Sequence, residues 1–223
     1  MEADKRLCVI LVGLPARGKT FIARKIARYF NWLGIQSSVF NVGNYRRKLC
    51  GTALPSSFYS PDNQEAVNQR NAAAMACLDD LITWLLTEDG SIKDSSLRDG
   101  LMQDSQSQST LEQHQNCQKV AIYDATNTTE QRRSSLIQKL KENQIGAMII
   151  ESICTDDAVI LENIQSVKYK NNPDYQEASF TAAITDFEMR IKNYEKTYET
   201  VDPCKHPDIP VVKLIDLGRR LVD

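Results

Sequence analysis

The chain of 223 residues has little of what several protein classes require. It contains two histidines, His114 and His206, and its six cysteines form no CxxC pair, so neither a zinc site nor a disulfide framework is expected. No run of 18 apolar residues occurs, which argues against a transmembrane helix. The first residues lack the apolar core and cleavage site of a signal peptide. With 27 basic against 29 acidic residues, a general nucleic-acid binder is also disfavoured. We therefore expect a cytoplasmic protein with reduced thiols and neither nucleic acid nor membrane as a partner.

Short strand-like segments alternate with helical patterns along the chain. The strands are expected at residues 7–12, 39–42, 119–123, 147–153 and 211–215. Apolar side chains at helical spacing predict helices at 20–33, 62–87, 130–143, 156–167 and 175–198. This alternation is typical of an α/β fold with a doubly wound, mainly parallel sheet and helices on both faces.

Residues 91–118 differ in composition from the rest of the chain. They hold six serines, six glutamines and few aliphatic side chains, so they can bury little apolar surface. We expect a flexible surface insertion within a single domain of residues 1–223. A solvated loop is favoured over a regulatory element.

Residues 13–20 (GLPARGKT) match the phosphate-binding pattern GxxxxGK[ST] between a predicted strand and a predicted helix. Glycines let backbone N–H groups surround an anion, and the helix N-terminus adds positive potential. Lys19 can reach the β- and γ-phosphates of a nucleotide, and the Thr20 hydroxyl can ligate Mg²⁺. The alternative is a fortuitous glycine turn with an exposed lysine, which this context disfavours.

Other polar side chains are expected at the same edge of the sheet. Asp124 follows the strand 119–123, where it could hold Mg²⁺, accept a proton from an attacking hydroxyl, or only cap a turn. Cys154 follows the strand 147–153, although cysteine is more often a core residue. The basic residues of this region are Arg46, Arg47, Arg70, Arg132, Arg133, Lys168 and Arg190. Singly each is more often a surface charge, whereas together they would suit a second phosphate.

Several segments together resemble one family, the kinase domain of 6-phosphofructo-2-kinase/fructose-2,6-bisphosphatase. They are GLPARGKTFIARKIARYFNWLG, VFNVGNYRR, AIYDATNTTEQRR, ESICTDD, ENIQSVKY, PDY and VKLIDLGRR. The resemblance runs from residue 7 to the last residue, the insertion excepted. It implies a P-loop NTPase-type fold and ATP-dependent phosphorylation of fructose 6-phosphate at its 2-hydroxyl, with Mg²⁺.

The resemblance also implies a role for each matching residue. ATP would contact Gly13, Leu14, Pro15, Ala16, Arg17, Gly18, Lys19, Thr20, Phe21, Asn163, Ile164, Gln165, Ser166, Val167 and Lys168. Fructose 6-phosphate would contact Arg46, Arg70, Thr126, Arg132, Lys168, Arg190 and Tyr194. The catalytic residues would be Lys19, Asp124, Cys154 and Lys168, and the metal ligands Thr20 and Asp124.

The resemblance has limits that leave alternatives open. Neither histidine lies in the Arg-His-Gly motif of the family's phosphatase domain, so that domain is not expected in this chain. The family implies a homodimer, but no segment identifies an interface. The alternatives are a pseudokinase or sensor that binds ATP and a sugar phosphate, and a P-loop kinase for another phosphorylated substrate.

Overall fold

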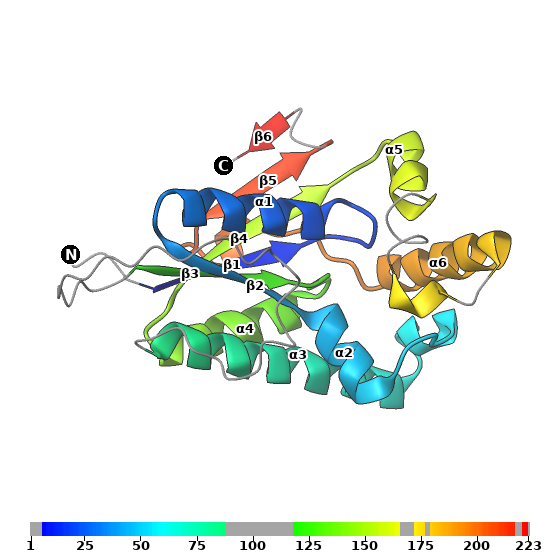
Figure 1. Ribbon diagram of the computed structural model, residues 1–223, viewed down its shortest axis with the longest axis horizontal. Helices are drawn as coiled ribbons and strands as arrows, with labels where there is room; N and C mark the ends of the chain where they lie inside the picture. Colours follow the sequence, from blue (N-terminus) through cyan, green and yellow to red (C-terminus); the bar gives the residue numbers. More distant parts are fainter. Residues whose placement is uncertain (1–5, 88–117, 166–171, 177–178, 217–219, 223) are drawn as a thin grey trace, which may run out of the picture.

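The computed structural model describes residues 6–87, 118–165, 172–176, 179–216 and 220–222. One sheet lies at its centre, with strands in the order β2-β3-β1-β4-β5-β6 (Figure 1). The strands are β1 (Arg6–Val12), β2 (Gln36–Asn41), β3 (Lys119–Asp124), β4 (Gly146–Ile153), β5 (Val211–Ile215) and β6 (Arg220–Val222). The first five pair in parallel, and β6 pairs antiparallel with β5.

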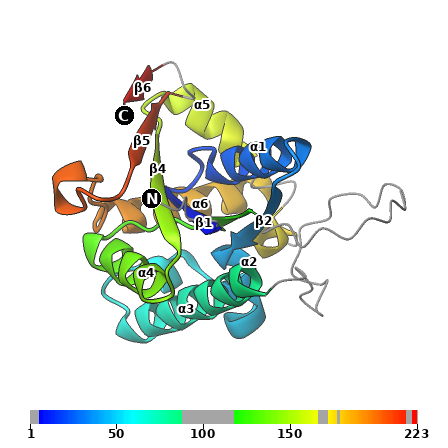
Figure 2. The ribbon, with the colours of Figure 1, turned by 90° about the vertical axis from the view of Figure 1, so that its left-hand side faces the viewer.

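Helices cover both faces of this sheet, as the doubly wound pattern predicted. Figure 2 shows α1 on one side and α3 and α4 on the other. The helices are α1 (Lys19–Trp32), α2 (Val42–Cys50), α3 (Gln64–Leu86), α4 (Glu130–Glu142), α5 (Asp157–Glu162) and α6 (Phe180–Glu195). The described residues also form the short 3₁₀ turns η1 (Ser56–Tyr59), η4 (Pro173–Tyr175) and η5 (Pro203–Lys205). Among the described residues, no helix is both long enough and apolar enough to span a membrane.

Strand β1 explains why the sheet needs two helical layers. Its residues 8–12 are completely or almost completely buried. Cys8, Ile10 and Val12 pack with α3 and α4 in one apolar cluster. Val9 and Leu11 pack with α1 in another. Because successive side chains of a strand point to opposite faces, a continuously apolar strand must be covered on both sides.

Three helices lie beyond the edge of the sheet where β1 leads into the loop before α1. Figure 1 shows α2, α5 and α6 at this edge. Helix α6 is fixed there partly by the Asp186 carboxylate, which accepts hydrogen bonds from the Ser56 N–H and the Tyr175 hydroxyl, both at 2.8 Å. These helices therefore surround the carboxyl ends of the parallel strands, the usual ligand position in such sheets.

Three sequence predictions differ from the structure. Residues 42–50 form helix α2, where no helix was predicted. The Asn41 side chain caps it by accepting a hydrogen bond from the Asn44 N–H. Helix α6 begins at Phe180 rather than at 175, because the Asn172 and Ser179 side chains start two separate turns. Strand β6 was not predicted, since three residues carry too short a pattern. The predicted insertion 91–118 lies outside the described residues, except for Gln118.

Candidate functional site

The loop between β1 and α1 needs glycine at two positions. Gly13 has φ +138°, and a Cβ built there would lie 2.4 Å from the Ser152 carbonyl oxygen on β4. Its N–H donates to the Thr126 carbonyl oxygen at 3.0 Å. Gly18, the N-cap of α1, also has a positive φ, 77°. Gly13 thus lies between β4 and the segment that follows β3, in backbone contacts too close to leave room for a side chain.

Lys19 begins α1, and its side chain returns over the loop that precedes it. The Nζ atom donates to the Leu14 carbonyl oxygen at 2.5 Å, and the residue is buried. The ammonium group therefore lies at the N-terminus of α1, where positive potential favours an anion. The strand, loop and helix that residues 13–20 predicted are therefore present, and the contact of Lys19 with a phosphate stays a prediction.

Asp124 and Asn41 end two adjacent strands and lie opposite each other in the β2–β3 register. The Asn41 Nδ2 atom donates to Asp124 Oδ2 at 2.6 Å, and Asp124 is buried. Asn41 therefore orients the carboxylate while it also caps α2. The sequence analysis did not single out Asn41, although it stands in the VFNVGNYRR segment.

A cavity of about 880 Å³ opens beside these residues. It is lined by the loop before α1, the ends of β2 and β3, and parts of α2, α3, α4 and α6. The site residues expected from the sequence that line it are Pro15, Ala16, Arg17, Gly18, Lys19, Thr20, Phe21, Arg46, Arg70, Asp124, Thr126, Arg132, Asn163, Arg190 and Tyr194. One cavity thus brings together residues from nearly the whole length of the chain.

A cluster of arginines lies around the buried Asp174 of η4, next to this cavity. Asp174 Oδ2 lies 2.5 Å from Arg46 Nη2. It lies 3.6 Å from the Nη1 atoms of Arg47 and of Arg190. The guanidinium of Arg190 also stacks on the Tyr59 ring, 3.9 Å from its centroid. Because removing one partner of a buried ion pair costs roughly 3–5 kcal/mol, the cluster depends on an ionised Asp174.

The electrostatics of this cluster favour its charged form. Burial raises the pKa of Asp174, but the hydrogen bond from Arg46 and the charges of Arg46, Arg190 and Arg47 outweigh it, so the pKa is lowered. Burial lowers the pKa of Arg190, while Tyr59, other tyrosines and Asp174 raise it above its usual value overall. The Asp174 carboxylate therefore stays ionised at neutral pH, and three arginines surround this single negative charge.

Two further arginines line the cavity from the side of α3 and α4. Arg70 donates hydrogen bonds to the carbonyl oxygens of Phe58 and Ser60, so part of its guanidinium holds η1 in place. Burial is the main cause that lowers its pKa. Arg132 donates to the side chain of Asn71 on α3. The cavity therefore has positive charge both at α2 and α6 and at α3 and α4.

Comparison with known proteins identifies the family. The model of the family 6-phosphofructo-2-kinase matches residues 1–94 and 102–223. The chain belongs to the 6-phosphofructo-2-kinase family. It is 39% identical over 215 residues to 6-phosphofructo-2-kinase/fructose-2,6-bisphosphatase 3 of Homo sapiens, and 38% identical over 212 residues to the bifunctional protein of Gallus gallus. These matches cover 96% and 95% of this chain but 36% and 39% of the relatives, so the chain spans little more than a third of their length.

Solved structures agree with this fold at much lower identity. Kti12 of Chaetomium thermophilum, crystallised with ADP-AlF₃, is 14% identical, with a TM-score of 0.55 over 92% of this chain and 88% of that one. A kinase-like protein of Chloroflexus aurantiacus is 13% identical, with a TM-score of 0.50 over 99% and 90%. At such identity these likenesses concern the fold alone.

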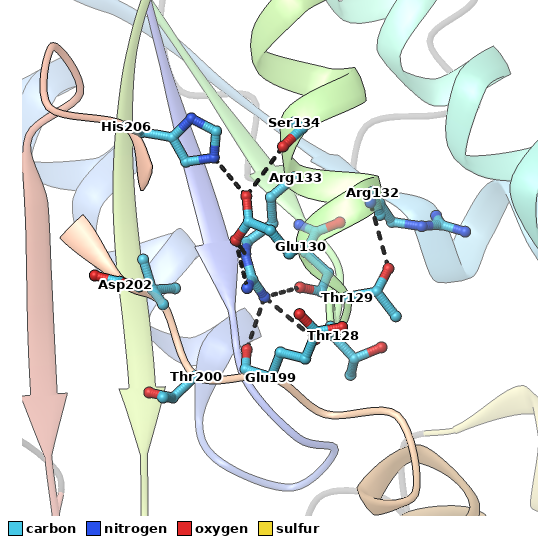
Figure 3. Close-up of polar contacts among 12 residues, drawn as sticks. Thr128, Thr129, Glu130, Arg132, Arg133, Ser134, Glu199, Thr200, Asp202 and His206 are labelled. Atoms are coloured by element: carbon cyan, nitrogen blue, oxygen red, sulfur yellow. Dashed lines mark hydrogen bonds and ion pairs between the residues drawn. The ribbon is translucent and has the colours of Figure 1, made fainter. Parts of the chain in front are cut away.

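Two adjacent arginines of this 6-phosphofructo-2-kinase family member lie in different surroundings. Arg132 reaches towards α3, whereas Arg133 points the other way (Figure 3). Arg133 is completely buried and donates to the carbonyl oxygens of Asn127, Thr128 and Glu199 at 2.9–3.2 Å, and to the Glu130 carboxylate at 2.8 Å. It therefore joins the chain after α6 to the start of α4, and it is a structural residue rather than a ligand of the cavity.

The structure does not bring Cys154 to the cavity. The side chain is buried in an apolar cluster with Ala16, Ile160 and Ile164. Its sulfur approaches only the Asp156 carbonyl oxygen, at 3.9 Å, among the contacts described for it. Cys154 therefore belongs to the apolar cluster that includes Ala16 of the loop before α1. Its position after β4 in the sequence does not indicate this direction of the side chain.

Residues 163–168, which were expected to contact the nucleotide, also differ in whether they line the cavity. Asn163 lines the cavity and donates its Nδ2 hydrogen to the Ala16 carbonyl oxygen at 3.1 Å. Ile164 is buried in the same apolar cluster as Cys154. The described residues that line the cavity do not include Gly13, Leu14, Ile164 or Gln165. Ser166, Val167 and Lys168 lie outside the described residues.

Thr20 and Asp124 both line the cavity, as the expected metal ligands should. Oxygen donors of this kind suit Mg²⁺, which takes few ligands from a protein and completes its shell with phosphate oxygens and water. The residues present therefore fit the metal that the resemblance implied. In the part of the chain that the structure describes, no cluster of three or more His, Cys, Asp or Glu side chains forms a metal site.

Proposed function

We propose that the chain transfers the γ-phosphoryl group of ATP to the 2-hydroxyl of fructose 6-phosphate. The observation that carries this proposal is one cavity lined by two separate anion-binding groups: the loop 13–20 and the arginines of α2 and α6. A kinase for a phosphorylated substrate needs both, because it must bind a nucleotide and a second phosphate at once. A volume of about 880 Å³ lies within the range for small-molecule sites.

The nucleotide phosphates would lie at the loop before α1. Backbone N–H groups of the loop and the Lys19 ammonium would bind the β- and γ-phosphates. A phosphate oxygen would then take the place of the Leu14 carbonyl oxygen as the acceptor of the Lys19 hydrogen bond. Mg²⁺, when bound at Thr20 and Asp124, would neutralise phosphate charge. Asn163, which already contacts the loop, would lie on the nucleotide side. The contacts of Ser166, Val167 and Lys168 with ATP stay predictions.

The sugar phosphate would be anchored through its 6-phosphate by Arg46, Arg190 and neighbouring arginines. Guanidinium groups form paired, charge-assisted hydrogen bonds with phosphate oxygens, which fixes orientation as well as affinity. Such anchoring would place the 2-hydroxyl in line with the γ-phosphorus. Asp124, oriented by Asn41, is the carboxylate able to accept the hydroxyl proton or to hold the metal.

A coupled assay with Mg-ATP and fructose 6-phosphate tests the proposal. The product should be an acid-labile bisphosphate, because the phosphate at the 2-position is attached to the anomeric carbon. An acid-stable product would mean transfer to another hydroxyl. Binding of both ligands without turnover would instead support a sensor. An Arg70→Ala variant with an unchanged KM for fructose 6-phosphate would favour a P-loop kinase for another substrate.

The same proposal covers domain organisation and assembly. We propose that residues 1–223 form a single kinase domain, since one sheet and its two helical layers run through the described residues. The homodimer implied by the family stays a prediction, and sedimentation at micromolar concentration would test it.

A further inference from the structure

The arginine cluster contains a residue that the sequence analysis did not single out, Asp174. It lies behind the wall of the cavity: its neighbours Asn172 and Pro173 line the cavity, and Asp174 is not among the described lining residues. Its side chain is only 3% exposed. A carboxylate is costly to bury unless it is paired, and here all its pairing comes from arginines that do line the cavity.

We propose that Asp174 is a positioning residue of the sugar-phosphate subsite, holding Arg46, Arg47 and Arg190 in the arrangement that receives a phosphate. The inference rests on the proposed function for the identity of the sugar but not for the presence of an anion site. Arg46 and Arg47 come from α2 and Arg190 from α6. Arg46 donates to the Gly51 carbonyl oxygen and Arg47 to Asn44 Oδ1, but these local bonds do not set their position relative to Arg190. The carboxylate between them does.

Asp174 is itself held firmly enough to serve this purpose. Its N–H donates to the Asn172 side chain at 3.1 Å, which closes the η4 turn. The next residue, Tyr175, is buried against the Phe187 ring and donates its hydroxyl to Asp186 of α6. The turn thus presents the carboxylate from a rigid support, as preorganised binding requires.

The net charge of the cluster and two of its unpaired donors, Arg190 Nε and the Tyr59 hydroxyl, point to a bound anion. Three guanidinium groups meet one carboxylate, which leaves two positive charges without a counter-charge among these residues. Within this cluster, three buried polar atoms have no hydrogen-bond partner among the described residues: Asp174 Oδ1, Arg190 Nε and the Tyr59 hydroxyl oxygen. Arg190 Nε is a donor, the kind of atom that a phosphate oxygen would satisfy.

The charge of Asp174 also has an effect that opposes phosphate binding. The Asp174 carboxylate repels an incoming phosphate, so its removal could strengthen binding if the arginines stayed in place. Arg46 and Arg47 would keep their bonds to Gly51 and Asn44, and Arg46 and Arg190 their contacts with the Tyr59 ring. No carboxylate would then offset the repulsion among the three guanidinium groups. Without the carboxylate, the two residues of α2 would turn away from Arg190, and the phosphate would have to bring them together again. Positioning therefore outweighs repulsion.

The test is an Asp174→Asn variant compared with the unaltered chain in steady-state kinetics. The KM for fructose 6-phosphate should rise about tenfold or more, the effect of misplacing a substrate anchor. The KM for ATP should stay within about twofold, because the loop 13–20 is untouched. A fall in the sugar-phosphate KM would show that Asp174 is only a competitor of the phosphate and would overturn the proposal.

Glu151→Gln is the matched control for loss of a buried carboxylate. Glu151 is completely buried and bonds to Tyr198, Thr200, the Val201 N–H and Lys213, none of which lines the cavity. This variant should lose stability yet keep both KM values within about twofold. An equal rise in the sugar-phosphate KM in both variants would mean that destabilisation alone explains the effect, which contradicts a positioning role.

Two further measurements keep the proposal testable if turnover or folding fails. If Asp174→Asn does not fold, Asp174→Glu retains the charge but moves it by one methylene; a raised sugar-phosphate KM supports positioning, and an unchanged one refutes it. If the unaltered chain shows no turnover, the proposed function fails, and calorimetry with inorganic phosphate decides the inference. Phosphate should then bind the unaltered chain and bind Asp174→Asn at least about tenfold more weakly. No binding to the unaltered chain would overturn the inference.

Discussion

The Asn41 side-chain amide donates a hydrogen bond of 2.6 Å to the Asp124 carboxylate, across two parallel strands that bring the two residues into register. The other end of the same amide, Oδ1, accepts from the Asn44 N–H and caps α2. One side chain thus links the orientation of the buried carboxylate to the start of the helix that carries Arg46 and Arg47.

Replacement of Asn41 by serine should separate these two tasks. Serine is also a good N-cap, so α2 should persist, but its short side chain cannot reach Asp124. We expect kcat to fall by about tenfold or more, the usual effect of removing a residue that orients a site carboxylate. Thermal unfolding should stay close to that of the unaltered chain. Asn41→Ala, which loses the cap as well, should lose about 1 kcal/mol of stability in addition. Equal kcat values for Asn41→Ser and the unaltered chain would contradict the orienting role.

Lys19→Met should remove turnover without unfolding the protein. The methionine keeps most of the apolar stem but lacks the charge that would meet the developing phosphate charge, so kcat should fall by about 10²-fold or more. Lys141→Met, the same substitution at an exposed position of α4, should leave kcat unchanged. Circular dichroism and melting temperature would verify that both variants fold. A folded, active Lys19→Met protein would refute the role given to the loop 13–20.

Cys154→Ala should keep its catalytic rate. The thiol is buried among Ala16, Ile160 and Ile164, so its loss should cost about 1 kcal/mol of stability through poorer packing. Steady-state kinetics should show kcat within about threefold of the unaltered value, since small packing losses spare the reacting groups. A drop of about 10²-fold in a stable variant would mean that the thiol takes part in the reaction, as the family resemblance suggested.

Acid should weaken the contacts that Glu130 makes with the chain after α6. Burial raises the pKa of Glu130, but hydrogen bonds from His206, Arg133 and Ser134 lower it overall from 4.5 to about 2. A carboxyl whose pKa is lower in the folded state contributes stability above its unfolded pKa, and this contribution is lost as pH falls towards the folded value. Glu130→Gln should therefore be less stable than the unaltered chain at pH 7, with a difference that shrinks between about pH 4.5 and pH 2. Urea unfolding at several pH values would measure it, and a difference independent of pH would contradict the assignment.

The sequence by itself determined the five parallel strands, the phosphate-binding loop and the family, but not strand β6 or the strand order. A buried strand, a glycine-bearing loop and a helix are local patterns, and Gly13, Lys19 and Thr20 can be read from spacing because the loop is formed by consecutive residues. Strand β5 was predicted at the residues where it is found, 211–215. Helix bounds differed from the prediction where a capping side chain sets them, as Ser179 does for α6.

Only the tertiary structure decided which side chains meet. Arg46, Arg190 and Asp174 are separated by up to 144 positions, and no periodicity relates them. Adjacent residues of one helix point about 100° apart, so Arg132 could reach the cavity while Arg133 became a buried structural residue. Cys154 likewise follows a strand at the edge of the site, yet it packs beneath Ala16. Local patterns specify elements, whereas the direction of each side chain depends on packing between elements that are distant in the sequence.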